Sequence, residues 1–369
     1  MFNIFSSQNP IGINISDSSI KLAQIGSKGS LRILKKIRLP EGFVINGEII
    51  KEDETADVLR ELIKETNKLK KINAKEVVCA ISEKIAYLKI LTINNPNGNI
   101  DSQILVELSK QLPEDTDKLY IDWQILNETA DNSANSKIEI IAGAGRRDLI
   151  EKNIRVIEKA GLLPILIEIE SLSTARALIF NEKKTKTIFL KEPDKSQKES
   201  PTIGILDIGL KTSSFIIYKK TVNFSIDMPF SDEKIIKLIS ESLNITYAQA
   251  KKAKSACGMD PKKARGNVKK ILTPYIAEIA KHIKKIEEYH INYNNGDKFD
   301  KILLCGGGAS LLAIDKAIEE NTKIKTSIGN ATINLKTPPS SNIELLEKET
   351  IQYEASIGSA LIGYWLCKK

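Results

Sequence analysis

The sequence predicts an α/β protein built from two similar halves joined by a polar linker. Alternating apolar residues, typical of strands, and apolar residues three and four apart, typical of helices, are interleaved in both halves. The segment INISDSSIK at 13–21 matches LDIGLKTSS at 206–214, with an offset of 193 residues. A stretch rich in Lys, Glu and Ser at 181–201 separates the halves, and we interpret it as the linker.

In the first half, strand and helix patterns follow one another closely. Residues 12–25 and 31–39 alternate as strands, and 55–70 carries apolar residues at helical spacing, among them Leu59 and Leu62. The remaining elements expected here are paired strands at 77–93, a short helix at 104–111, a strand at 120–126, a polar loop at 127–137, a strand at 138–144, a helix at 148–160, a strand at 165–169 and a helix at 172–180.

The second half begins as the first does, with a strand, a turn and a strand over 203–218. A long helical stretch at 264–293 is expected to break near Pro274, because proline removes a backbone N–H and clashes with the preceding turn. The other elements expected are helices at 231–243 and 247–255, a strand at 301–304 that runs into three glycines, and a closing helix at 354–367.

Composition bounds the class of protein. The 369 residues, 41% hydrophobic and 28% charged, are enough for two or three globular domains. No apolar run approaches the roughly 18 residues of a spanning helix, and the first residues lack the pattern of a secretion signal. Four cysteines without a CxxC pair are expected to be reduced, intracellular thiols. The two histidines, His282 and His290, offer almost no candidates for a histidine-based catalytic or metal site.

The positive charge is unevenly distributed. The formal net charge is +8, and residues 251–291 contain eleven Lys or Arg against four Asp or Glu, which gives this stretch +7. A solvated helical face is one interpretation, and a patch that meets anionic lipid or another protein is a second. Nucleic acid is not expected as a partner, because the stretch has few aromatic residues to stack on bases and no known binding motif.

The repeated segment has the character of a phosphate-binding hairpin. A tight hairpin exposes backbone N–H groups at its tip, and a small residue there lets phosphate approach closely. A carboxylate just before the turn, such as Asp207, can hold a hydrated Mg²⁺ ion against the phosphates. A Walker A loop at 204–212 is disfavoured, because Leu210 interrupts the motif and a strand rather than a helix follows it.

Five segments in order resemble motifs of the actin-like ATPase superfamily. IGINISDSSIKLAQI (11–25) and LDIGLKTSS (206–214) resemble its two phosphate loops, and LLCGGGASLL (303–312) resembles its adenosine loop. EIESLSTARAL (168–178) and YEASIGSAL (353–361) resemble the two helices that connect its lobes. LSKQLPEDTDKLYIDWQIL (108–126) resembles a pattern of the PilM family of type IV pilus assembly proteins, and the chain is similar to that family over almost its whole length.

The resemblance implies an actin-like ATPase fold, in which two lobes face each other across a nucleotide cleft and a small subdomain of the FtsA and PilM type is inserted in the first lobe. The implied boundaries are a first lobe core (1–75 and 163–190), the inserted subdomain (76–162), a linker (191–202), a second lobe core (203–244 and 298–350), an upper second lobe (245–297), and a closing helix that returns to the first lobe (351–369).

The same resemblance implies which residues hold ATP or ADP. From the first hairpin they are Asn14, Ser16, Ser18, Ser19 and Lys21; from the second hairpin they are Asp207, Gly209, Lys211, Thr212 and Ser213; and from the adenosine side they are Lys254, Gly306, Gly307, Gly308 and Ser310. Asp207 is the implied Mg²⁺ residue, acting through water. No catalytic residue is assigned.

Several positions depart from the family pattern. Asn14 and Ser16 stand where an aspartate and a glycine are usual, and Lys251 replaces a glutamate beside the adenosine. Asp17 adds a negative charge at the hairpin tip, close to where phosphates would lie, and is a weaker candidate to replace Asn14 beside the metal. Because cation affinity follows ligand charge, Mg²⁺ binding should be weakened and ATPase activity very slow or absent.

The family implies a cytoplasmic adaptor at the inner face of the cytoplasmic membrane. It would bind ATP or ADP, grip the N-terminal cytoplasmic peptide of a PilN-like protein, contact other pilus platform components, self-associate, and reach the membrane only through partners. Residues 52–54 are either an acidic lining for that peptide or a solvated helix start. Alternatives are a pseudo-ATPase with the same partner, a GspL-like secretion protein and an FtsA-like division protein. The last two are disfavoured because no membrane span or terminal amphipathic helix follows the closing helix.

Overall fold

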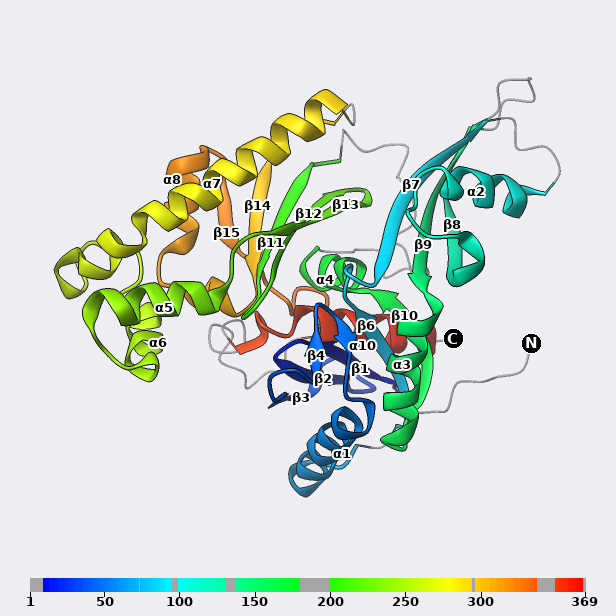
Figure 1. Cartoon of the computed structure of the whole chain (residues 1–369), viewed down its shortest axis with the longest axis horizontal. Coiled ribbons are helices and arrows are strands. Elements are labelled where there is room, and N and C mark those ends of the chain that lie inside the picture. The colour runs from blue at the N-terminus through cyan, green and yellow to red at the C-terminus, as the bar shows by residue number, and fades with distance from the viewer. Residues whose placement is uncertain are drawn as a thin grey trace. The chain divides into compact units, whose positions relative to one another are not determined.

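The computed structural model describes residues 9–72, 74–94, 99–129, 137–179, 200–293, 296–336 and 349–367 (Figure 1). The chain divides into two compact units. The first comprises Met1–Lys195 and Ala355–Lys369, and the second comprises Ser196–Glu354. Most of the expected linker at 191–202 lies outside the described residues.

Each unit is organised around a five-stranded sheet, and the two sheets have the same topology. In the first unit the order is β10-β6-β1-β2-β3, and in the second it is β13-β12-β11-β14-β15. In both, the first three strands in sequence pair antiparallel, and the later two add in parallel on the other side of the first strand. The repeated segment therefore opens a repeated sheet.

The strands of the first sheet are short and largely buried at the centre. β1 and β6 are buried along nearly their whole length, as expected for strands covered on both faces. Their bounds are β1 Ile11–Ser16, β2 Ser19–Ile25, β3 Leu31–Arg38, β6 Glu76–Ile81 and β10 Leu163–Ile169, and a two-stranded hairpin, β4 Val44–Ile45 and β5 Glu48–Ile49, precedes the first helix.

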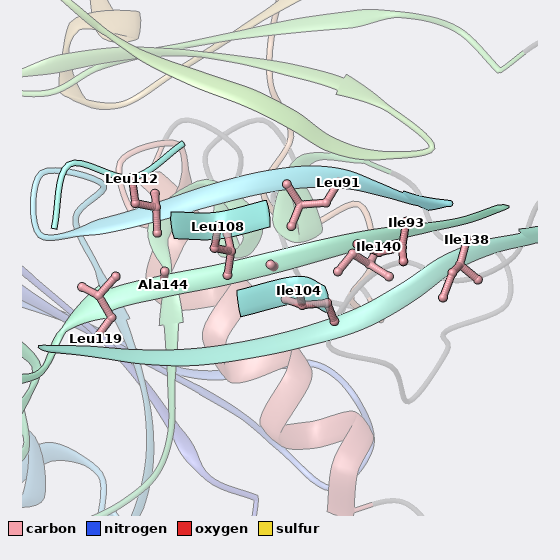
Figure 2. Close-up of a cluster of buried hydrophobic side chains, with 10 residues drawn as sticks. Leu91, Ile93, Ile104, Leu108, Leu112, Leu119, Ile138, Ile140 and Ala144 are labelled. Atoms are coloured by element: carbon pink, nitrogen blue, oxygen red, sulfur yellow. The ribbon is translucent and has the colours of Figure 1, made fainter. Parts of the chain in front are cut away.

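A separate three-stranded sheet, with the order β7-β9-β8, lies within the range 76–162 that is expected as an inserted subdomain. Its strands are β7 Ala86–Asn94, β8 Leu119–Thr129 and β9 Lys137–Arg146. Helix α2, Ile100–Ser109, packs on one face, where its Ile104 and Leu108 are buried among apolar side chains of the strands (Figure 2). Burial of each such side chain contributes about 1.5–3 kcal/mol, so this cluster holds the subdomain together.

The range expected as the inserted subdomain contains strands of two different sheets. Strand β6 pairs in parallel with β1 and belongs to the core sheet, whereas β7 pairs with β9. Residues 77–93, expected as one pair of strands, are thus divided between two sheets. The subdomain with its own sheet begins at β7 and ends at β9, within the expected range of 76–162.

Helices α1, Glu52–Leu69, and α3, Arg147–Lys159, are joined by ion pairs. Arg155 binds Glu52 through two hydrogen bonds of 2.8 and 2.9 Å, and Lys159 lies 2.7 Å from Asp53. The hydrogen bond from Arg155 lowers the pKa of Glu52. Two carboxylates of the 52–54 run are therefore engaged within the first unit, which argues against an acidic lining for a peptide.

The second unit carries its helices beside the sheet strands β11 Ile203–Ile208, β12 Ser213–Lys219, β13 Thr221–Met228, β14 Lys301–Cys305 and β15 Thr326–Ile328. The helices are α5 Asp232–Leu243, α6 Tyr247–Ala256, α7 Asn267–Tyr293 and α8 Ile314–Thr322. Ser231 caps α5, and Thr246 forms a capping box with Gln249 at the start of α6. These caps fix where the two helices that flank the candidate site begin.

The expected break near Pro274 is not observed. Helix α7 runs for 27 residues with Pro274 inside it. Pro274 is exposed, whereas Leu272 and Ile276 on the opposite side are fully buried. The carbonyl of Lys270, which proline deprives of its helical donor, lies four residues before it and can bond to water on this exposed side. Burial of the apolar face therefore carries the helix through the proline.

The first unit is completed by helices α4, Glu170–Leu178, and α10, Glu354–Cys367, most of which returns from the far end of the chain. A Cβ atom at Gly12 would overlap the α10 backbone at Ser356, and one at Gly358 would overlap the α4 backbone at Ser173. Glycine at these positions allows backbone-to-backbone packing between α10, β1 and α4.

A buried ion pair between α4 and β10 also bonds to α10. Arg176 contacts Glu168 at 2.8 Å, and both side chains are almost fully buried. Arg176 also donates to the Gly358 carbonyl at 3.1 Å, and Ser359 donates to Glu168 at 3.0 Å. Buried charges persist in a protein only when they are paired and hydrogen-bonded, and this cluster meets that condition by bonding across α4 and α10.

Candidate functional site

The first candidate element is the hairpin between β1 and β2. Ser16 and Ser19 form its last residue pair, so Asp17 and Ser18 make the tip. The Ser16 hydroxyl donates to the Ser19 carbonyl at 3.0 Å and closes the turn. Lys21 lies directly opposite Asn14 across the two strands. Residues opposite each other in a sheet share a face, so the predicted site residues Asn14 and Lys21 lie together.

Asn14 is fully buried and contacts a carboxylate that we did not anticipate. Its Nδ2 donates to Oε1 of Glu170 at 3.0 Å, from the first turn of α4. Its Oδ1 is buried without a hydrogen-bond partner among the described residues. A buried polar atom of this kind is normally satisfied by a ligand or an ordered water, so the hairpin fits a polar ligand.

Asp17 does not direct its charge into the hairpin. Its two carboxylate oxygens accept the backbone N–H groups of Asn46 and Gly47, each at 2.9 Å. These two residues form the turn between β4 and β5 and have positive φ angles of 52° and 78°. The Asp17 carboxylate thus stabilises a neighbouring turn, which argues against a role in replacing Asn14 beside a metal.

The second hairpin has a longer tip of four residues, 209–212, between β11 and β12. Two backbone hydrogen bonds join this tip to the start of α5. The Asp232 N–H donates to the Gly209 carbonyl at 2.9 Å, and the Glu233 N–H donates to the Leu210 carbonyl at 3.0 Å. Lys211 lies 3.3 Å from the Glu233 carboxylate. The predicted residues Gly209, Lys211 and Thr212 are therefore positioned by a capped helix.

Ser213, the first residue of β12, carries another unsatisfied group. It is 4% exposed, and its Oγ has no hydrogen-bond partner within the described part of the chain. Ser213 pairs with Ile208 at the end of the hairpin. The second hairpin therefore repeats the property of the first, in which Asn14 presents a buried polar atom that a ligand could satisfy.

The glycine turn after β14 lies against the second hairpin. Gly306 has φ of 79°, and a Cβ atom there would overlap Oδ1 of Asp207. A Cβ atom at Gly308 would overlap the Ile208 side chain. Both glycines are required by close approach, and the predicted residues Asp207 and Gly306 are brought into contact. Ser310 donates to the Gly307 carbonyl at 2.7 Å and closes the turn.

Lys254 lies beneath this turn and not on an open surface. It is 1% exposed, and its Nζ lies 2.6 Å from Oδ1 of Asp232 and 3.2 Å from the Gly307 carbonyl. Burial lowers the pKa of Lys254, and the Asp232 carboxylate opposes that shift. Lys254 thus supports the glycine turn from inside. Lys251, the departure from the family pattern, is exposed on α6.

Asp207 belongs to a cluster of three side chains with possible metal-binding atoms. Single donor atoms of Asp207, Cys305 and Glu354 all lie within 4.8 Å of one another. The parallel pairing of β11 with β14 places Asp207 beside Cys305, and Glu354 is fully buried in the first turn of α10. Carboxylate oxygens suit Mg²⁺, whereas a thiol does not. Asp207 and Glu354 fit the ion, and Cys305 does not contribute to it.

The comparisons with known proteins bear on this arrangement. A family model described as "Type IV pilus assembly protein PilM" matches residues 12–364. The chain belongs to the PilM family. The resemblance seen in the sequence motifs is confirmed, and the chain is thereby assigned to type IV pilus assembly.

Solved structures confirm the actin-like fold. A PilM-PilN type IV pilus biogenesis complex matches with a TM-score of 0.77 and 17% identity, over 97% of this chain and 99% of that one. The ethanolamine utilization protein EutJ from Carboxydothermus hydrogenoformans matches with a TM-score of 0.57 and 15% identity, over 98% and 92%. MreB 5 of Spiroplasma citri bound to AMPPNP matches with a TM-score of 0.51 and 13% identity, over 95% of each chain.

One further finding concerns membranes. Within the described ranges, no helix of this PilM-family chain combines the length and the apolar character that crossing a bilayer requires.

Proposed function

We propose that this protein is a nucleotide-binding adaptor of the type IV pilus assembly platform, at the cytoplasmic face of the inner membrane. The PilM family match over residues 12–364 carries the proposal. In it, the protein binds the N-terminal cytoplasmic peptide of a PilN-like protein, contacts other platform components and self-associates. The similarity in fold to a PilM-PilN complex supports the choice of partner.

For the peptide we propose the face of the inserted sheet that α2 does not cover. Leu91 and Ile93 of β7 face α2, so Leu88 and Ile90 face the other way, and both are half-buried. Leu88 lies opposite Gly143, where an added Cβ atom would come within 3.6 Å of the Ile169 side chain, so β10 borders this part of the face. An extended apolar peptide gains side-chain contacts from such a surface and main-chain bonds from a strand edge.

A fluorescence-polarisation titration tests this assignment. The probe is a peptide of the first dozen or so residues of the PilN-like protein encoded beside this gene. We expect binding, and we expect Ile90→Lys to weaken it about tenfold or more, because a buried apolar contact is replaced by a desolvated charge. Val106→Lys on the outer side of α2, where Val106 is 54% exposed, is the matched control. No binding at about 100 μM, an affinity too weak for a specific partner, would contradict the adaptor role.

For the nucleotide we propose the second hairpin and the glycine turn, with Asp207, Gly209, Thr212 and Gly306 as its contacts. The supporting observations are the buried Ser213 hydroxyl and the close contact of Gly306 with Asp207. ATP or ADP supplies phosphate oxygens for the backbone donors of the hairpin tip. The first hairpin, with Asn14 and Lys21, is proposed as a second phosphate loop from its sequence resemblance, and because Asn14 brings no charge, Mg²⁺ binding and hydrolysis are weak.

Calorimetry with ATP and Mg²⁺ tests the nucleotide site separately from the peptide site. We expect saturable heat for the wild type and for Asp227→Ala on the exposed side of β13, and none for Asp207→Ala. If the wild type gives no heat at millimolar nucleotide while the peptide still binds, the pseudo-ATPase with the same partner becomes the better description. Steady turnover above about 1 s⁻¹, at the low end of ordinary enzymes, would contradict weak hydrolysis.

A further inference from the structure

The C-terminal end of α1 combines the features of a surface that meets anionic lipid. Leu69, the last residue of the helix, is 75% exposed, more than any of the other large apolar side chains described as exposed. Lys64, Lys68, Lys70, Lys71 and Lys75 surround it in sequence, and all five are exposed. We call Leu69 and these five lysines the α1 tip.

The charge balance of this region is strongly positive. Residues 60–75 contain six Lys or Arg, counting Arg60, and two Glu, which gives +4. Beside the α1 tip lies a hollow of about 560 Å³ that is lined by Arg60, Ile63, Lys64, Asn67, Lys68 and Ala160. Its lining includes three cations and no carboxylate. Arg60 and Lys68 are ion-paired with Asp57 and Glu65 on the same helix, and a phosphate group in the hollow would add a second anionic partner beside these cations and Lys64.

The exposure of Leu69 is a fixed feature of the fold. The Asn67 side chain accepts the N–H of Ile72 at 2.6 Å, and Arg32 donates to the Lys71 carbonyl at 2.6 Å. These bonds hold the backbone on the far side of Leu69 against the first unit. The Leu69 side chain is therefore held where an apolar partner could cover it, and such burial would be favourable.

We propose that the α1 tip binds an anionic lipid surface directly, with Leu69 inserted at the headgroup level, the lysines on the lipid charges, and the adjacent hollow around a headgroup phosphate. Lysines on flexible stems beside a single protruding apolar residue suit a fluid, two-dimensional array of phosphates. An acidic protein partner would need a pocket that fits the Leu69 side chain, whereas a lipid surface takes up the side chain without one. The proposal differs from the expectation that membrane contact comes only through partners, and it does not rest on the peptide or nucleotide sites.

Vesicle flotation at low ionic strength tests the proposal. The full-length protein is mixed with vesicles of phosphatidylcholine and phosphatidylglycerol in equal parts, or of phosphatidylcholine alone. We expect binding to the anionic vesicles only. Each lysine near an anionic surface is worth a factor of about five, so Lys70→Glu with Lys71→Glu should reduce partitioning by about thirtyfold or more. Leu69→Ser should reduce it by about tenfold.

The matched control is Lys284→Glu with Lys285→Glu on α7, where both residues are exposed and the change of charge is the same. We expect it to bind as the wild type does. An equal loss in this variant would overturn the location, because it would show a general charge effect. All substituted residues are exposed, and thermal melts establish that each variant is folded.

Two further outcomes decide between sources of the negative charge. Inorganic phosphate at matched ionic strength should compete for the hollow and lower partitioning only in part, because Leu69 and the lysines outside the hollow still contact the lipid. Complete displacement would show that the anion contact in the hollow alone carries the binding, and it would overturn the proposal. Failure of the wild type to float with anionic vesicles would also overturn it, and would leave an acidic protein as the occupant. Retention in the presence of phosphate, lost in the Leu69 and Lys70–Lys71 variants, supports a lipid surface.

Discussion

At the scale of single residues, Asn14 determines what the first hairpin can hold. Its amide donates to Glu170, and its oxygen is buried. Replacement by Asp exchanges a hydrogen bond for two carboxylates about 3 Å apart. We predict that Asn14→Asp lowers the free energy of unfolding by about 1–3 kcal/mol in the absence of Mg²⁺, and that millimolar Mg²⁺ restores most of it. Urea denaturation with and without the ion measures both effects.

The double variant Asn14→Asp with Glu170→Gln controls for this prediction. The Gln amide can donate to the new carboxylate, so both the loss of stability and its reversal by Mg²⁺ should largely disappear. A single variant that Mg²⁺ stabilises no more than it does the wild type would rule out a cation site at this hairpin.

His290 makes the stability of the second unit depend on pH. Its ring is 3% exposed, stacks on Phe299 and finds no hydrogen-bond partner among the described residues. Burial lowers its pKa below the ordinary 6.5, opposed by Asp297 and Glu287 and reinforced by Lys219. Above pH 6.5 the ring is neutral in both states and contributes nothing to the pH dependence. Below it, the unfolded chain binds a proton that the native chain does not, so stability falls with falling pH.

We predict that the free energy of unfolding decreases by up to about 1.4 kcal/mol per pH unit below pH 6.5 through this residue alone. His290→Phe should remove that contribution, and His282→Asn, at a more exposed position of the same helix, should retain it. Denaturation curves at closely spaced pH values provide the measurement. Identical pH profiles for the wild type and His290→Phe would contradict the assignment.

At the scale of elements, the glycine turn after β14 offers a sharp pair of substitutions. Gly306 has positive φ and no room for a Cβ atom beside Asp207, whereas a Cβ atom at Gly307 would find only Asp232 at 3.6 Å, an ordinary contact. We predict that Gly306→Ala costs about 1–3 kcal/mol or more and abolishes nucleotide heat, while Gly307→Ala is nearly neutral in both. Equal behaviour of the two variants would show that the turn is not held against Asp207.

Elements with one buried face could be located from the sequence. Helix α1, expected at 55–70, runs over Glu52–Leu69 because Ala56, Leu59 and Leu62 face the core. Pairing partners could not be located: β6 and β7 follow each other as two apolar strand segments but belong to different sheets. Residue alternation shows that a strand has a buried face, and it carries no record of which neighbour supplies the hydrogen bonds.

The candidate site was predictable in its backbone and not in its carboxylates. The hairpins and the glycine turn follow from small residues at close approaches. Glu170, Asp232 and Glu354 could not be identified in advance, because each lies in the first turn of a helix. An acidic residue there is common, since it interacts favourably with the helix dipole, and a functional carboxylate looks the same in sequence.

At the scale of the whole molecule, the two units differ in how the chain builds them. The second unit is one continuous segment, whereas the first requires residues from both ends. The returning helix α10 packs on β1 through Gly12 and bonds to α4 through Gly358 and Ser359. Its side chains are nearly all buried, so its removal would expose the apolar interior of the first unit.

We predict that a chain ending at Glu354 loses cooperative structure in the first unit and keeps it in the second. Hydrogen exchange should show fast exchange in β1 and β6 and retained protection in β11 and β14. Addition of the missing segment as a separate peptide should restore protection in the first unit. Protected β1 amides in the truncated chain without the peptide would show that α10 is dispensable to that core.

The buried cluster of Glu168, Arg176 and the α10 backbone also affects how the molecule responds to a pulling force. The chain leaves the first unit after α4 and re-enters it at α10. The cluster bonds these two helices to each other through Arg176 and the Gly358 carbonyl. A force applied to the second unit therefore reaches the first unit through two chain connections. Both connections end at helices that are bonded to each other. The two helices share the force, and neither helix should separate from the first unit before the bonds between α4 and α10 break. Under a pulling force, we expect the first unit to unfold in one step when these bonds break, and not to unravel gradually from one end of the chain.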